Sequence, residues 1–506
     1  MVFEPNFAKV SSSDRKNIGI MQSVVEVVLP IQDGVIDEVY SVGAKACVLN
    51  FDVVNRVIDF AGLVDLQVMY KGDVGVSAID YSAEFKDKYM ASEDVAGELV
   101  LNTNVVDVNS QISGNGVKII AIIEVSIDEI ITKDVNVLVR VKGDGVYQNT
   151  KELEYATYIG RAYEKFDVSH EVSISGAKNV LMVTPCVSLT NVTPKDNYLI
   201  LNGVLGLDVC YQTGENINDI ASNYYNVDFS WEVALSGMNE DNFVESMICL
   251  LSNEIKVTTT PEENSSNVSI YVPVVYSGYV FNNNKIEVVD DVYLEDYYLS
   301  VTTENAESIV SSGVIDFTDN ISGTASIMET APFIDEVLGV STNNIVLARS
   351  VVEDNKLIVE GIANASVLYF TKETNELTSV VVEMPFVVEQ KAEWGIPSIS
   401  SICLSGISAR SKRGKEIEVS AKLNIYGDLY SVNTISLISD IALGEEKPED
   451  DCSLFIYIVK PGQTLWDIAK ELGVSIDLIL EQNEGLELPL KTGEKVVIYK
   501  PKVVKF

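Results

Sequence analysis

The sequence predicts a mainly β protein, with three repeated β-sandwich-like domains followed by a small α+β domain of βααβ order. Short runs rich in Val, Ile, Thr and Tyr, such as "EVSAKLNIYGDLY" (Glu418–Tyr430), are typical of strands. A motif recurs at about 140–160 residues, which is the length of a whole domain. The last fifty or so residues instead carry helical periodicity. These observations together predict the fold class.

The repeat is marked by a glycine followed eight residues later by a tyrosine. The three segments read "VIDFAGLVDLQVMY" (Val57–Tyr70), "LILNGVLGLDVCY" (Leu199–Tyr211) and "LIVEGIANASVLY" (Leu357–Tyr369). We call Gly62, Gly203 and Gly361 the repeat glycines. Because a glycine inside a strand indicates a bulge or a close backbone approach, their role is interpreted as structural. We expect them to occupy equivalent strand positions.

A second marker lies upstream of each repeat glycine. "IDEV" at residues 36–39 recurs at residues 334–337, and "AKNV" occupies the matching place at residues 177–180. From the last Val of each marker to the repeat glycine the distance is 23, 23 and 24 residues. A short helix is expected near each marker.

These patterns divide the chain into six segments. The N-terminal extension is residues 1–18, and the acidic linker with its Pro, "LGEEKPEDDCS", places a boundary at residues 444–455. The β repeats are predicted at residues 19–150, 151–310 and 311–443, and the C-terminal domain at residues 456–501.

Charge and hydropathy exclude several classes of function. The net charge of −39 disfavours binding to nucleic acid and to anionic membrane surfaces, because both are themselves negatively charged. No apolar run reaches membrane-spanning length, and "VKIIAIIEV" (Val117–Val125) is interpreted as a buried strand, so no direct membrane insertion is expected. The N-terminus lacks the pattern of a secretory signal, so a cytoplasmic protein is expected.

No pattern of residues points to catalysis. The six cysteines have no zinc-type spacing, and they are expected to be reduced core residues. The single histidine, His170, has no counterpart in the other repeats. There is no GxSxG elbow, phosphate-binding glycine loop or HExxH motif. We therefore expect no enzymatic activity, no cofactor and no metal site.

The C-terminal segment reads as strand, helix, helix, strand. Thr464 is expected to cap a first helix, with Asp467 completing a capping box, and Gly473 to end it. Ser475 is expected to cap a second helix. The strands are "FIYIV" (Phe455–Val459) and "EKVVIY" (Glu494–Tyr499). Residues 456–506 hold seven Lys and seven Asp or Glu, so this segment is close to neutral and the acidity lies upstream.

This segment resembles a LysM domain. The residues that carry the resemblance are Tyr457, Val459, Gly462, Thr464, Leu465, Ile468, Ala469, Gly473, Val474, Ser475, Asn483 and Gly493. The resemblance implies a groove between the first strand–helix loop and the loop after the second helix, where such domains commonly bind N-acetylglucosamine chains. The groove residues implied are Gly462, Gln463, Thr464, Leu465, Trp466, Asn483, Gly485 and Leu486.

Departures from the LysM pattern lie at or near this groove. Gln463 replaces the usual acidic residue, Ile498-Tyr499 replaces the usual Ile-Pro, and "LELPLKT" precedes Gly493. Glycan binding is therefore expected to be weak or absent, with a protein surface as the main ligand. Trp466 has two interpretations: an exposed anchor beside the groove, or a partly buried rim residue.

Three β repeats followed by a LysM domain resemble the SipL-type family of clostridial spore-coat assembly proteins, whose repeats are called SPOCS domains. The resemblance implies a mother-cell protein at the forespore surface and in the spore coat. It also implies binding to the coat morphogenetic ATPase SpoIVA and to other spore-coat proteins. The alternatives are a cell-wall protein that binds peptidoglycan or chitin-type glycan, and a LysM hub protein of a phage tail or injection machine.

Overall fold

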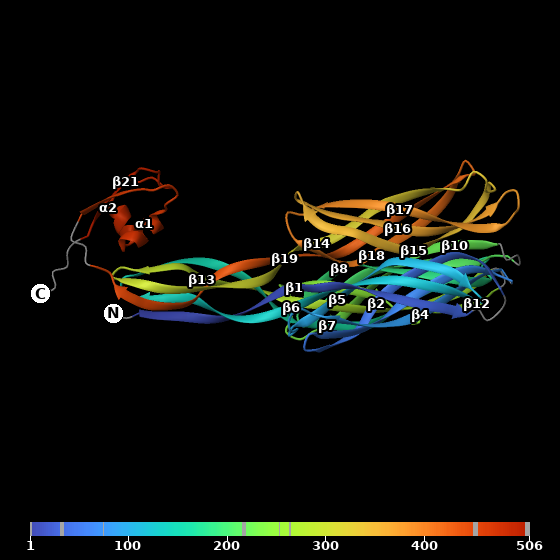
Figure 1. The fold of residues 1–506 in the computed structure, drawn as a ribbon, viewed down its shortest axis with the longest axis horizontal. Coiled ribbons are helices and arrows are strands. Elements are labelled where there is room, and N and C mark those ends of the chain that lie inside the picture. The colour runs from blue at the N-terminus through green and yellow to red at the C-terminus, as the bar shows by residue number, and fades with distance from the viewer. Residues whose placement is uncertain are drawn as a thin grey trace.

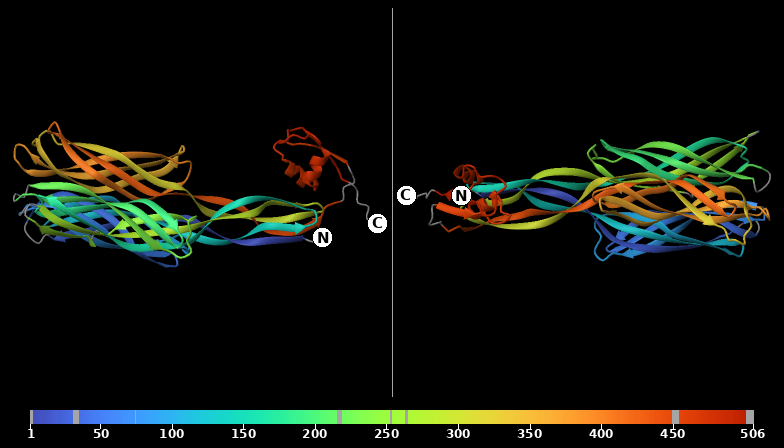
Figure 2. Two further views of the ribbon diagram at one scale, coloured as in Figure 1. Left: turned by 180° about the vertical axis from the view of Figure 1, so that it is seen from behind. Right: turned by 90° about the horizontal axis from the view of Figure 1, so that it is seen from above.

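Each β repeat is organised by one long antiparallel pair formed by its first and last strands (Figure 1). The computed structural model describes residues 3–30, 35–73, 75–214, 219–251, 254–262, 265–448 and 454–500. In its described part the protein has an elongated shape, with a broad head, a narrow stalk and the C-terminal domain beside the stalk tip (Figures 1 and 2). The long pairs run through the stalk and continue into the head.

The strands fall into three sets. Repeat 1 contains β1 (Phe3–Pro30), β2 (Ile36–Val54), β3 (Val57–Gly72), β4 (Gly75–Met90), β5 (Glu98–Ser113) and β6 (Gly116–Gly143). Repeat 2 contains β7 (Val146–Ser175), β8 (Asn179–Lys195), β9 (Tyr198–Gln212), β10 (Ile220–Ala234), β11 (Phe243–Leu250), β12 (Lys256–Pro261) and β13 (Ser265–Leu294). Repeat 3 contains β14 (Tyr297–Ser326), β15 (Ile334–Glu353), β16 (Lys356–Thr371), β17 (Leu377–Lys391), β18 (Ile396–Lys412) and β19 (Glu416–Glu446).

In the head, every repeat is a sandwich of two antiparallel sheets. The sheet orders are β1-β6-β5 and β2-β3-β4 in repeat 1, and β14-β19-β18 and β15-β16-β17 in repeat 3. Repeat 2 has β8-β9-β10 and a four-stranded sheet in which β13 pairs with β7, β11 and β12. Each sandwich encloses its own buried apolar cluster. The predicted mainly β fold with repeated sandwich-like units is confirmed.

The stalk consists of three two-stranded ribbons. There the first and last strands of each repeat pair only with each other, over residues 3–14 with 131–143, 146–157 with 282–294, and 297–310 with 431–446. A two-stranded ribbon is marginally stable alone in water. The ribbons pack together through layers to which every repeat contributes: Val10, Val137, Leu153, Val288, Ala306 and Leu437 in one, and Leu138, Val141, Val289, Val292, Ile438 and Ile441 in the next.

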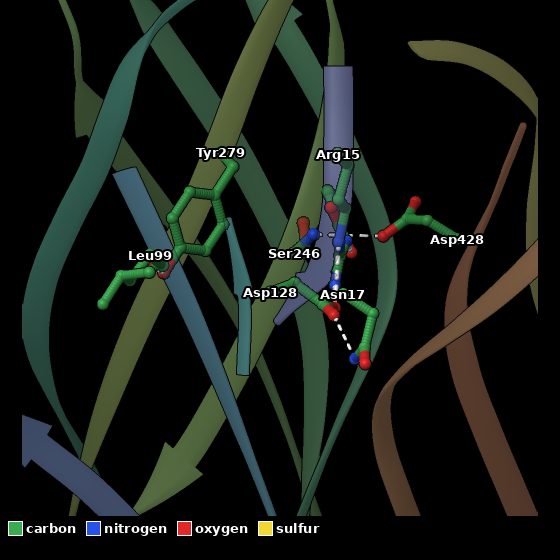
Figure 3. Close-up of polar contacts among 8 residues, drawn as sticks. Arg15, Asn17, Leu99, Asp128, Ser246, Tyr279 and Asp428 are labelled. Atoms are coloured by element: carbon green, nitrogen blue, oxygen red, sulfur yellow. Dashed lines mark hydrogen bonds and ion pairs between the residues drawn. The ribbon is translucent and has the colours of Figure 1, made fainter. Parts of the chain in front are cut away.

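A buried ion pair lies where the stalk enters the head (Figure 3). Arg15 on β1 donates to Asp128 on β6, with Nη2 to Oδ2 at 2.6 Å, and also to Glu245 on β11. The Arg15 guanidinium lies 4.7 Å from the ring centroid of Tyr430 on β19. Because an unpaired charge buried here would cost several kcal/mol (about 3–5), this cluster ties the orientation of repeats 1 and 2 to each other. The cation–π contact extends it to repeat 3.

A second contact between repeats involves Asp428 of repeat 3. Its carboxylate accepts the backbone N–H of Ser246 from repeat 2 at 3.0 Å (Figure 3). Burial raises the pKa of Asp428 to about 7. The junction thus holds polar groups from all three repeats in a largely buried setting.

The repeat glycines occupy equivalent positions, as predicted. Val39, Val180 and Val337 pair with the three repeat tyrosines, and the glycines pair with Val48, Leu189 and Leu347. On the neighbouring strand, each glycine lies opposite a phenylalanine, in the pairs Gly62–Phe85, Gly203–Phe229 and Gly361–Phe386. A Cβ built on any of them lies within 2.6 Å of that ring. The glycine therefore leaves room for the aromatic ring, which is why the residue recurs.

The helices expected near the markers are absent from the described residues. Residues 36–39, 179–180 and 334–337 are strands instead, and a β-bulge follows or interrupts each one. A β-bulge adds one residue to a strand and interrupts the alternation of side chains between the two faces of the sheet. This interruption explains why the sequence pattern near each marker suggested a helix.

The strand ends also differ from the predicted domain limits. Residues 3–18, predicted as an extension, form part of β1 and pair with β6. The predicted limits at 150/151 and 310/311 fall inside β7 and β14, because the chain passes between repeats at the turns 144–145 and 295–296 of the stalk tip. Of the predicted linker, residues 444–446 belong to β19 and residues 449–453 lie outside the described residues.

Replacing Gly361 by Ala should destabilise the protein by about 1–3 kcal/mol. The added methyl group would meet the Val346 carbonyl oxygen at 2.4 Å and the Phe386 ring at 2.5 Å. Gly339→Ala is the matched control, because it lies in β15 of the same repeat and a Cβ there meets nothing within 4 Å. Thermal and urea unfolding of both variants provide the measurement; equal losses would contradict the ring-accommodation explanation.

Candidate functional site

The C-terminal domain has the predicted βααβ order. It consists of β20 (Leu454–Ile458), α1 (Leu465–Leu472), α2 (Ile476–Gln482) and β21 (Lys495–Tyr499), and β20 pairs antiparallel with β21. Thr464 caps α1 in a capping box with Asp467, and Gly473 ends the helix with a left-handed backbone. Ser475 caps α2. The hydrogen bond from the Thr464 backbone N–H lowers the pKa of Asp467.

The two helices and the sheet share a small apolar core. Its buried members are Val459, Leu465, Ile468, Ala469, Val474, Ile479, Val496 and Ile498, together with Tyr293 from the stalk. Of the predicted groove residues, Leu465 is buried in this core and Leu486 packs against it. These two residues therefore support the domain from inside.

The first segment of the predicted groove is the loop between β20 and α1, and side-chain hydrogen bonds hold this loop in place. The amide of Gln463 donates to the Tyr457 hydroxyl at 2.8 Å, and its carbonyl oxygen accepts the backbone N–H of Lys460 at 3.0 Å. The Tyr457 hydroxyl donates to Glu471 at 2.6 Å, and this bond is the main cause of the lowered pKa of Glu471. Gly462 has a left-handed φ of 79°. Gln463 thus closes the turn with a neutral amide.

The second groove segment is anchored by Asn483. Its amide donates to the carbonyl oxygens of Ile479 and Val497, and its side-chain oxygen accepts the N–H of Val497. These bonds hold the end of α2 against β21. Gly485 follows with a φ of 92° and is exposed. Asn483 therefore positions the loop, while Gly485 lies on its open side.

Comparison with known families identifies this domain. Residues 457–498 match the LysM domain. The match covers the whole βααβ unit apart from its outermost residues and leaves the β repeats unmatched. No curated protein matches the chain, and no solved structure matches it. The structure places the eight predicted groove residues in or beside the two loops of this LysM domain, and their role in binding stays a prediction.

Trp466 faces the stalk. Its indole Nε1–H donates to Asp291 on β13 at 2.8 Å, and its ring meets the Tyr293 ring edge-on at 5.0 Å between centroids. Lys470, one turn later on α1, also reaches Asp291 at 2.7 Å. A β-bulge in β13 between Val289 and Asp291 accompanies this contact, and bulges commonly redirect a side chain. Of the two interpretations of Trp466, partial burial is the one found.

The contact with the stalk continues along the turn between the helices. The Tyr293 hydroxyl donates to the Val474 carbonyl oxygen at 2.7 Å, and its ring stacks on Tyr147. Burial raises the pKa of both tyrosines. Gly473 lies so close to the Glu295 carbonyl oxygen that an added Cβ would approach it to 2.8 Å. The LysM domain is therefore docked on the stalk through one face of α1 and the α1–α2 turn.

Sequence reasoning did not single out the outer face of the LysM sheet. Its exposed side chains are Leu454, Ile456, Ile458, Val497 and Tyr499. The signal was present, because "LFIYIV" (residues 454–459) and "KVVIY" are apolar at nearly every position and so place apolar residues on both faces of the sheet.

Three further findings concern the described residues as a whole. Its residues contain no group of three or more His, Cys, Asp or Glu arranged to hold a metal ion. Among the described helices, none has the length and apolar character needed to cross a membrane. His170 lies on β7, 5.6 Å from the Tyr225 ring between centroids.

Replacing Asp291 by Ala should loosen the LysM domain from the stalk. The change removes the acceptor of both Trp466 and Lys470, at a cost of about 1–2 kcal/mol, since the ion pair is partly exposed and contributes little. The indole N–H signal of Trp466, one of three tryptophans, should shift and exchange faster in nuclear magnetic resonance spectra.

Asp290→Ala is the matched control. Asp290 is the neighbouring residue and pairs with Lys151 of the stalk at 2.5 Å. An unchanged Trp466 signal in Asp291→Ala, or the same change in both variants, would contradict the docking contact.

Proposed function

We propose that the protein is a non-enzymatic assembly scaffold whose LysM domain binds a protein partner. The observation that carries this proposal is the placement of the LysM domain beside the stalk tip, away from the three-repeat head (Figure 1). A binding domain held in this way can meet one partner while the head remains free for others. The extensive sandwiches, with a buried core in each repeat, suit a structural role.

The resemblance to SipL-type proteins makes the proposal specific. By this resemblance the partner is the spore-coat morphogenetic ATPase SpoIVA, and the protein acts in the cytoplasm of the mother cell, at the forespore surface and in the coat. Other spore-coat proteins would bind to the three-repeat head. The order of three SPOCS-like β repeats followed by a LysM domain supports this assignment.

The LysM match also favours a second function, binding of N-acetylglucosamine glycan. Gln463 argues against it, since its amide is already bonded to Tyr457 and Lys460 within the groove. A sugar would have to compete with these bonds or form new ones at the exposed loop around Gly485. We therefore rank the protein partner above glycan.

Trp466→Ala should weaken binding of the full chain to the SpoIVA-type ATPase while the repeats stay folded. The half-buried ring docks on the stalk and keeps an exposed part, which we propose contacts the partner; loss of an aromatic anchor costs about 2 kcal/mol or more, roughly thirtyfold in Kd. Calorimetric titration of the full chain with the ATPase, and separately with chitooligosaccharide, gives the measurement.

Two control variants sharpen this experiment. Trp394→Ala removes a tryptophan that is 46% exposed in repeat 3 and should leave binding unchanged. Asp291→Ala loosens the LysM domain from the stalk without altering the domain's own residues, so it separates docking on the stalk from direct contact with the partner. Tight sugar binding with no ATPase binding would overturn the proposal and favour the glycan function.

A further inference from the structure

Four of the six cysteines gather around one cavity in the head. The cavity has a volume of about 250 Å³ and is lined by residues of all three repeats. Cys186, Cys249 and Cys403 are among its lining residues, and Cys47 directly follows another, Ala46. The expectation that the cysteines are reduced core residues does not account for this gathering.

The first pair joins repeats 2 and 3. Cys186 on β8 and Cys403 on β18 form a disulfide with a Cα–Cα distance of 5.9 Å, across a sequence separation of 217 residues. This distance lies inside the range that a disulfide requires. Two of the cysteines expected to be reduced are therefore paired in the structure.

The second pair lies between repeats 1 and 2. The side chains of Cys47 on β2 and Cys249 on β11 interact, and both thiols are free; the hydrogen bond of the Cys47 thiol is to the Val48 carbonyl oxygen at 3.6 Å. Cys47 is buried, whereas Cys249 is half-buried at the cavity. Two free thiols in contact across a repeat boundary are a candidate pair for a second disulfide.

One cysteine of each pair occupies an equivalent position in its repeat. Cys249 pairs with Val275 and Cys403 with Asn424 in the sheet ladders. Positions in the repeats can be matched by counting back from the stalk layer that contains Val288 and Leu437. Val275 lies 13 residues before Val288 (288 − 275), and Asn424 lies 13 residues before Leu437 (437 − 424). Cys249 and Cys403 thus hold matching positions, and each meets a cysteine of the preceding repeat.

Repeat 1 carries no cysteine at this position. Glu124 lies 13 residues before Val137 of the stalk layer (137 − 124), and its ladder partner is Asn104. The boundary between repeats 3 and 1 therefore has no matching thiol on the repeat 1 side.

We propose that Cys47 and Cys249 are a second disulfide site, so that oxidation joins repeat 1 to repeat 2 and repeat 2 to repeat 3 around the cavity. No disulfide would link repeat 3 to repeat 1. The head then has a reduced state held by non-covalent contacts and an oxidised state with two covalent links between repeats.

The oxidant we name is a small disulfide, RSSR, of the glutathione type. The Cys249 thiolate attacks one sulfur of RSSR, forms a mixed disulfide and releases one RS⁻. The Cys47 thiolate then attacks the Cys249 sulfur and releases the second RS⁻. The sum is two protein thiols plus RSSR giving one protein disulfide plus two RSH, with both protons carried by the released thiols. The reverse exchange with RSH reduces the site.

The local setting fixes the order of these steps. Contact with Cys249 and burial raise the pKa of the Cys47 thiol well above its ordinary value, which makes it the slower first nucleophile. Cys249 lines the cavity and is half-buried, so it is the more accessible of the two thiols. Oxidation should stabilise the head, because each link closes a long loop in the unfolded chain, 202 residues (249 − 47) for the second pair and 217 for the first.

The test is thiol counting and peptide mapping of the folded full chain after incubation with oxidised glutathione or with dithiothreitol. After reduction, six thiols should react in denaturant. After oxidation two should remain, Cys210 and Cys452, and non-reduced digests should contain the 47–249 and 186–403 linked peptides. The oxidised protein should melt several degrees above the reduced protein.

Two variants provide the control. Cys249→Ser should leave three reactive thiols after oxidation and lose part of the rise in Tm. Cys210→Ser removes a buried cysteine outside both pairs and should keep the full rise. Cys47 and Cys249 that stay alkylatable after oxidation, or equal rises in Tm for the two variants, would overturn the proposal.

Discussion

The pairing of the first strand of each repeat with its last strand is the constraint on which the rest of the structure depends. In the head, this strand pair forms part of one sheet of each sandwich. In the stalk, it forms one of the three ribbons. In the stalk, a ribbon has two strands and no further sheet to pack against within its own repeat. Its apolar residues are buried only by the other two ribbons, so the stalk requires all three repeats at once.

The stalk in turn determines where the LysM domain lies. The turns at its tip bring Tyr147, Asp291, Tyr293 and Glu295 to one end of the molecule, where α1 docks. The LysM domain is nearly neutral, while the body carries essentially all of the net charge of −39. A partner that binds at the stalk tip therefore contacts a nearly neutral domain next to an acidic body, whose charge acts on the approach of the partner.

The repeated β architecture and the LysM domain were predictable because their signals are local. The repeat glycines recur since a phenylalanine ring from the adjacent strand needs the space, and the caps Thr464, Gly473 and Ser475 mark the helices directly. The docking of Trp466 on Asp291 was not predictable, because the two residues lie 175 positions apart and a bulge sets the geometry. The cysteine pairs and the true strand ends depend on the same kind of distant pairing.

The central claim is that the stalk ribbons of the three repeats stabilise one another, and hydrogen exchange of the Leu153→Ala variant tests it most directly. Leu153 is buried in a stalk layer, and its truncation costs about 2–5 kcal/mol. Exchange should rise in the stalk parts of β1 and β14, which belong to repeats 1 and 3, as well as in β7. The control Val301→Ala, at a stalk residue that is 40% exposed, should change little. An increase confined to β7 and β13 would contradict the account.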